Sequence, residues 1–121
     1  MLNKVIIVAN LTKDPESRQT NNGTSVCKLG LAINRKWKDK EGNPVEEATF
    51  VDCDVWGKTA DFCRDYLRKG FKVFIEGRLK MDTWQDQKTG QNRSRLGLVA
   101  ESVQNMTPKQ QQPPLFPEAR Q

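Results

Sequence analysis

The stretch TFVDCDVWGKTADFCRDYLRKGFKVFIEG, residues 49–77, holds two β-strand patterns separated by one helical pattern. Apolar residues alternate with polar ones over 49–56, which predicts a strand that ends at the following glycine. Over 59–69 the apolar residues recur at helical spacing, with Thr59 as the expected N-cap and Gly70 as the expected αL C-cap. A strand, one short amphipathic helix and a second strand therefore follow one another.

Strand patterns continue on both sides of this unit. Residues 3–10 form an apolar, β-branched run, and residues 26–33 alternate strictly. After the helix, a strand over 72–84 and a last strand over about 93–106 are joined by a polar hairpin loop. The resulting order is strand, strand, strand, helix, strand, strand.

This order predicts an all-β fold, a five-stranded Greek-key OB-fold barrel with one short helix between strands 3 and 4. Glycines at positions 30, 77 and 97 fall where a closing barrel must bend. Residues 1–106 are expected to form this single domain, and residues 107–121, rich in Pro and Gln, a short disordered tail. On the fourth strand, the residues expected to point inward are Val73, Ile75, Leu79 and Met81.

The composition limits the classes of function. The 121 residues leave room for one compact domain, which excludes a multidomain enzyme, and the net charge of +5 favours a polyanionic partner. Cys27, Cys53 and Cys63 lack CxxC spacing and the chain has no histidine, so we interpret them as apolar fillers and expect no metal or cofactor. The N-terminus does not match a signal peptide and no apolar run is long enough to span a membrane, which indicates the cytoplasm.

Aromatic side chains stand at outward positions of the predicted strands. Phe50 and Trp56 share the polar face of their strand with two aspartates, and Trp84 shares its face with Arg78 and Lys80. Exposed rings beside Lys and Arg are typical of proteins that stack the bases of a single strand and contact its phosphates. The alternative is that a neighbouring subunit covers these rings.

Trp37 lies in the densest basic cluster of the chain, which contains Arg35, Lys36, Lys38 and Lys40. By alternation, however, Trp37 continues the inward face of its strand. We therefore expect the strand to bend near Asn34, or to have opened into the charged loop that leads to the next strand near position 48.

From residue 3 to about residue 106 the chain resembles the bacterial single-stranded DNA-binding protein family. The resemblance rests on many short matches in one order, which is more specific than any single motif. The matching residues are Asn3-Lys4-Val5-Ile6-Ile7-Val8, Asn10-Leu11, Asp14-Pro15-Glu16, Asn22-Gly23, Trp37-Lys38-Asp39-Lys40, Val55-Trp56-Gly57-Lys58, Tyr66-Leu67-Arg68-Lys69-Gly70, Val73-Phe74-Ile75-Glu76-Gly77-Arg78-Leu79 and Trp84.

The resemblance implies a non-catalytic OB barrel that binds and protects single-stranded DNA, without reading its sequence, during replication, recombination and repair. It also implies a homotetramer in the nucleoid-associated cytoplasm. In that family, stacking rings occupy the positions held here by Trp37, Phe50, Trp56 and Trp84. Matching basic positions are Lys4, Lys38, Lys40, Lys58, Lys69 and Lys80, to which we add Arg35, Lys36 and Arg78 as candidate phosphate contacts.

Two features depart from the family pattern. Asp52 and Asp54 lie between two of the candidate rings and Asp82 lies near a third, so we expect them to repel phosphates and weaken binding. The family's tail usually ends in an acidic tip with a terminal Pro-Phe, whereas residues 115–121 read LFPEARQ. Recruitment of replication and repair proteins through an acidic tail is therefore not expected.

The first strand is the candidate oligomer interface. Its segment Val5-Ile6-Ile7-Val8 is apolar on both faces, which indicates a strand covered on both sides or paired with a neighbour. With Lys4, this segment would join the subunits of a homotetramer, or of a homodimer as the alternative.

Two other functions remain open at this point. Outward carboxylates at Asp52, Asp54 and Glu76 could hold Mg²⁺ for a nuclease, although no nucleophile beside a base completes such a site. An OB-fold accessory module of the primosome could use the same face to bind a protein partner.

Overall fold

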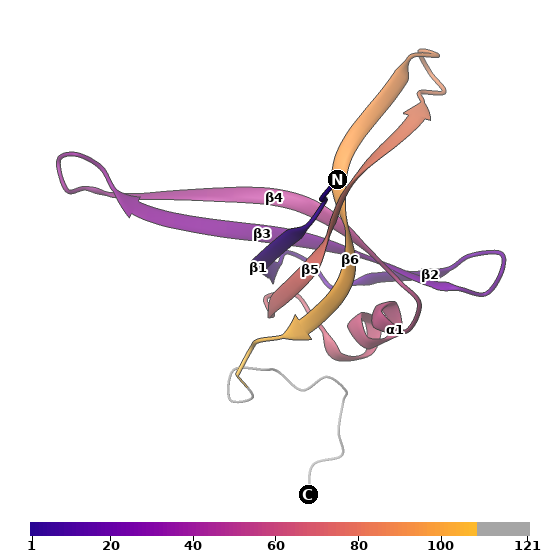
Figure 1. Cartoon of the computed structure of the whole chain (residues 1–121), viewed down its shortest axis with the longest axis horizontal. Coiled ribbons are helices and arrows are strands. Elements are labelled where there is room, and N and C mark those ends of the chain that lie inside the picture. The colour runs from indigo at the N-terminus through magenta and orange to yellow at the C-terminus, as the bar shows by residue number, and fades with distance from the viewer. Residues whose placement is uncertain (109–121) are drawn as a thin grey trace, which may run out of the picture.

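The computed structural model, drawn in Figure 1, describes residues 1–108. Its elements are β1 (Val5–Leu11), β2 (Glu16–Gln19), β3 (Ser25–Lys38), β4 (Pro44–Trp56), α1 (Gly57–Tyr66), β5 (Lys72–Gln85) and β6 (Asn92–Asn105). The predicted tail lies outside the described residues from position 109 onward.

Five of the six strands close into a barrel. The strand order is β1-β5-β6-β4-β3-β2, and an additional pairing joins β1 to β3. Strand β1 closes the barrel, because its residues 5–10 pair with β5 and its residues Asn10 and Leu11 pair with β3. The pairing of β4 with β6 is parallel and the others are antiparallel. The predicted five-stranded OB barrel is confirmed, and β2 is a sixth strand that hairpins onto β3.

The barrel interior is filled by the inward row of each strand, as alternation predicts. Val73 and Ile75 are buried, so these two inward positions of β5 are confirmed. The same core takes in Ala60 and Cys63 from α1, which lies below the barrel between β4 and β5 (Figure 1). The largest fully buried side chains are Phe71, Leu29, Leu31, Leu67, Ile75, Val55 and Val73.

The three cysteines are buried and free, which confirms their interpretation as apolar fillers. Burial raises the pKa of Cys27 to about 11 and that of Cys53 and Cys63 to about 12, because a thiolate would lose its hydration in the core. These thiols are therefore protonated and unreactive at neutral pH.

The helix begins and ends earlier than its sequence pattern predicts. Trp56 occupies the N-cap position and makes no side-chain cap hydrogen bond, so the predicted cap at Thr59 is wrong. At the other end Leu67 is the C-cap. Gly70 has the positive φ that was expected, +89°, but it lies in the following turn, where its N–H donates to the Leu11 carbonyl at 2.8 Å. The turn thus ties the end of the helix unit to β1.

The β3–β4 and β5–β6 hairpins extend beyond the barrel as exposed arms (Figure 1). We call residues 34–48 the β3–β4 arm and residues 78–97 the β5–β6 arm, and neither range contains a buried residue. The predicted inward positions of Leu79 and Met81 are wrong for this reason, since both side chains are exposed. A two-stranded ribbon that has left the barrel has no second layer to cover its inward row.

Gly77 marks the point where β5 leaves the barrel. Between Glu76 and Gly77 the register with β6 shifts, from Ser102 to Ala100, which leaves Glu101 as an extra residue in a β-bulge. A Cβ at Gly77 would collide with the backbone of Val99, so the close approach of the two strands requires glycine.

Candidate nucleic-acid interface

Three aromatic rings are exposed on the outside of the barrel and on its β5–β6 arm. Phe50 and Trp56 stand in the outward row of β4, and their exposed fractions are 70% and 44%. Trp84 is 49% exposed near the end of β5. The outward orientation predicted for these three residues from alternation is confirmed.

Trp37 is also exposed, but for a different reason from the predicted one. The strand neither bends nor opens at Asn34, because β3 stays paired with β4 as far as Lys38 and Trp37 lies opposite Val45. Trp37 keeps its inward parity, yet the β3–β4 arm has left the barrel, so that face meets solvent. The Arg35 guanidinium lies 4.8 Å from the centroid of the Trp37 ring, which places a cation on the stacking face.

Acidic and basic side chains fill the space between the exposed rings. We call this set the charge cluster, and its members line one cleft: Lys28, Asp52, Asp54, Lys80, Asp82 and Arg95. Arg95 forms an ion pair with Asp52, and Lys80 pairs with Asp82 at 3.5 Å. Lys28 lies directly opposite Asp54 in the ladder between β3 and β4. The acids are thus matched by neighbouring cations.

A second cleft joins the charge cluster to one of the rings. Phe50, Asp52 and Arg95 line it together with Gly30 and Thr12. The ion pair between Asp52 and Arg95 therefore lies beside Phe50, next to the face on which a base could stack.

The candidate phosphate contacts fall into several groups. Arg35, Lys36, Lys38 and Lys40 lie on the β3–β4 arm, where Lys36 pairs with Glu46 at 3.5 Å. Arg78 and Lys80 share the outward row of the β5–β6 arm with Trp84. These are the basic residues that the fold brings near the rings.

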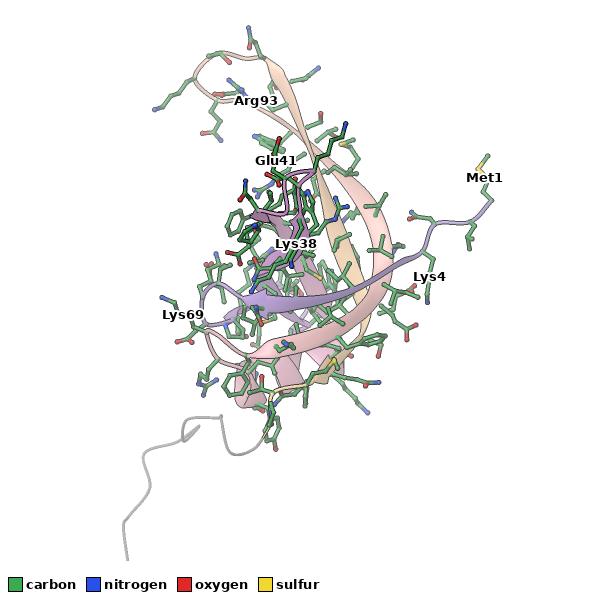
Figure 2. All side chains as sticks on the ribbon, turned by 90° about the vertical axis from the view of Figure 1, so that its left-hand side faces the viewer. Met1, Lys4, Lys38, Glu41, Lys69 and Arg93 are labelled. Atoms are coloured by element: carbon green, nitrogen blue, oxygen red, sulfur yellow. The ribbon has the colours of Figure 1, made fainter. Side chains whose placement is uncertain are left out.

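The remaining candidates lie outside the two arms. Lys58 is exposed in the first turn of α1, and Lys69 is exposed in the turn after it. Lys4 pairs with Glu76 at 3.2 Å and with Glu101 at 3.8 Å. Glu76 precedes Trp84 by eight strand residues, about 26 Å of extended chain. Figure 2 shows Lys4 and Lys69 on opposite sides of the molecule.

Several basic residues near the rings escaped the sequence prediction. Lys28 and Arg95 belong to the charge cluster, and Arg93 lies opposite Trp84 in the ladder between β5 and β6. Arg93 and Arg95 alternate with Ser94 and Leu96, and this pattern could have placed the two arginines on one face of the strand. It was obscured because the bulge at Glu101 reverses the parity of β6 partway along the strand.

The loop at the end of the β5–β6 arm is organised by one carboxylate. Asp86 accepts hydrogen bonds from the Lys88 N–H at 2.8 Å and from the Arg93 Nε–H at 3.1 Å. The first of these bonds contributes most to lowering the pKa of Asp86 below its usual range. Asp39 has a similar role in the other arm, where it accepts from the Glu41 and Asn43 N–H groups at 3.0 and 2.8 Å.

The site is therefore an open surface of rings and paired charges over a closed barrel. Within residues 1–108, no three His, Cys, Asp or Glu side chains are grouped so that they could hold a metal ion. No helix of this described part is long and apolar enough to cross a membrane. These features define an OB-fold protein whose exposed aromatic surface suits a long, flexible ligand.

Comparison with known proteins identifies the family. The model of the single-strand binding protein family matches residues 2–106, and the chain belongs to this family. Single-stranded DNA-binding proteins of Wolinella succinogenes and Helicobacter hepaticus are each 45% identical over 109 residues, or 90% of this chain. The chain spans 67% and 64% of the lengths of these two relatives.

A solved structure supports the same assignment. The chain is similar to a deletion mutant of the single-stranded DNA binding protein from Thermus aquaticus, with a TM-score of 0.77 and 29% sequence identity. The match covers 89% of this chain and 52% of that one. The barrel, its short helix and their order in the chain are therefore those of a known fold.

Proposed function

We propose that the protein binds single-stranded DNA without reading its sequence, and that it does so without catalysis. Bases would stack on Trp37, Phe50, Trp56 and Trp84, while phosphates contact the Lys and Arg side chains around them. The observation that carries this proposal is the exposure of Phe50, Trp56 and Trp84 on one outward surface, beside cations, in a member of the single-strand binding protein family. We further propose that it protects single strands during replication, recombination and repair, in the cytoplasm and at the nucleoid.

Replacement of single rings tests the stacking proposal. We expect Trp84→Ala to weaken the binding of a dye-labelled oligothymidine by about 1–3 kcal/mol, because the base that stacks on Trp84 loses its aromatic partner. Trp84→Phe keeps a stacking face and should retain most of the affinity. Fluorescence anisotropy gives the dissociation constants, and thermal unfolding checks that each variant is folded. If Trp56→Ala and Trp84→Ala both bind as tightly as the parent, the rings belong to a protein interface instead.

We also propose that β1 joins copies of this chain into a homotetramer, with a homodimer as the alternative. Residues 5–9 of β1 pair with β5 alone, so one edge of this segment has no partner strand within the described residues. On the outward face Ile6 is 59% exposed and Val8 44%, and Phe74 lies opposite Val8. An apolar strip beside an unpaired edge is an unfavourable surface for a monomer.

The assembly can be measured directly by sedimentation equilibrium at micromolar concentration. We expect a mass well above that of one chain for the parent protein and a lower mass for Ile6→Glu, which places a charge in the apolar strip. Met81→Glu, farther along the exposed β5–β6 arm, is a matched control that should not change the mass. A parent protein that sediments as a monomer contradicts the proposal.

A further inference from the structure

The charge cluster lies at the centre of the proposed DNA interface and is electrically balanced. It contains the carboxylates of Asp52, Asp54 and Asp82 and the cations Lys28, Lys80 and Arg95. Asp52 and Asp54 stand in the same outward row of β4 as Phe50 and Trp56, which they separate. A strand that lies across these rings must therefore pass over carboxylates.

We infer that Asp52, paired with Arg95, makes the interface selective for strands that carry stackable bases and disfavours other polyanions. This inference rests on the proposed function and names Asp52 as a specificity-determining residue of the same site. Asp52 imposes an electrostatic cost on a phosphate that approaches the centre of the interface, and it imposes no such cost on a base.

A phosphate gains little at the centre of the site. To contact Arg95 it must compete with the Asp52 carboxylate, which is held on a central barrel strand and cannot move far away. The Asp52 side chain is 30% exposed, so repulsion between it and an incoming phosphate is only partly screened by solvent. In the same way, a phosphate that approaches Lys80 is repelled by the Asp82 carboxylate.

A base does not meet this cost. Stacking on an aromatic ring depends on the face of the base and carries no net charge. Phe50 borders the same cleft as Asp52 and Arg95, so a stacked base could rest against the ion pair and leave it intact. Affinity at the centre then comes from bases, whereas affinity at the arms comes from phosphates.

The experiment compares two strands that have the same number of phosphates. One is a dye-labelled oligothymidine, and the other is a strand of the same length in which every position is abasic. The measured quantity is the ratio of their dissociation constants, for the parent protein, Asp52→Asn and Asp65→Asn. Asp65 is the matched control because it also forms an Asp–Arg pair, with Arg64 at 2.8 Å, but on α1.

We expect the parent protein to bind oligothymidine more tightly than the abasic strand. Asp52→Asn frees Arg95 and should tighten binding of the abasic strand by up to about fivefold, the upper end of the range for an exposed ion pair. The dissociation constants of the two strands should therefore become more similar. The salt dependence of abasic binding should steepen by about 0.7 in log–log slope for each additional phosphate that the protein neutralises. Asp65→Asn should leave the ratio unchanged.

The outcomes separate this inference from the proposed function. The role of Asp52 is overturned if Asp52→Asn leaves the ratio of the two dissociation constants unchanged. It is also overturned if Asp65→Asn reduces the difference between the two strands as much as Asp52→Asn does. In both cases the proposed single-strand binding stands. A parent protein that binds neither strand overturns both. Asp82→Asn, which frees Lys80, is a second variant for the case in which Asp52→Asn does not fold, and it should change the ratio in the same direction.

Discussion

At the scale of single residues, strand alternation decides which side chains meet solvent. Phe50 and Cys53 lie on one strand, yet the first is the more exposed ring of β4 and the second is fully buried. The sequence was enough to separate them, because a period of two needs only a few residues to establish the faces. It failed at Leu79 and Met81, since alternation tells which side a residue faces and not whether a second layer covers that side.

Gly77 allows a residue-scale prediction. We expect Gly77→Ala to lower the free energy of unfolding by about 1–3 kcal/mol, because its Cβ would collide with the backbone of Val99 at the bulge. Gly97→Ala is the matched control, since a Cβ there meets only the Asp52 carbonyl oxygen, at the ordinary contact distance of 3.4 Å. Urea unfolding monitored by circular dichroism measures both. Equal effects at the two positions would contradict a special requirement at Gly77.

At the scale of elements, the β3–β4 arm and β2 are what the sequence predicts least well, whereas the predicted bounds of β5 and β6 agree with the structure to within one residue. β4 begins at Pro44, although its apolar alternation starts only near residue 49, and the exposed β2 carries no apolar alternation at all. A ribbon that buries nothing need not carry a hydrophobic pattern, because its pairing comes from backbone hydrogen bonds and turn residues. The helix was predicted because its apolar face packs on the barrel core.

Asp86 supports a prediction for the β5–β6 arm. We expect Asp86→Ala to loosen the loop, because the Lys88 and Thr89 N–H groups lose their acceptor, and to speed amide exchange at both positions. The folded-state pKa of Asp86 is lowered, so its contribution is present above the unfolded value near 3.8 and is lost as the pH falls below it.

Hydrogen exchange followed by NMR at two pH values checks both statements about Asp86. Asp39→Ala is a reciprocal control, since it should speed exchange at Glu41 and Asn43 in the other arm and leave Lys88 unaffected. Exchange at Lys88 that is insensitive to Asp86→Ala would show that the hairpin alone holds the loop.

At the scale of the whole molecule, a closed barrel carries two extended arms (Figure 1), and the exposed rings lie on the barrel strand β4 and on both arms. The sequence predicted the rings and the barrel, because both follow from local patterns. It did not predict that Arg95 from β6 would meet Asp52 from β4, because that pair depends on strand neighbours and on the bulge at Glu101. The acids predicted to repel phosphates thus lie beside cations, and in the proposed account stacking is the main source of affinity at the centre of the site.

The most direct test of the stacking account is a titration of the protein with oligothymidine, followed by the fluorescence of its 3 tryptophans. Bases that stack on Trp37, Trp56 and Trp84 should quench the emission strongly and saturably at low salt, and added salt should reverse the quenching as phosphate contacts are lost. Emission that stays unchanged at low salt, up to a large excess of oligothymidine, would contradict the account.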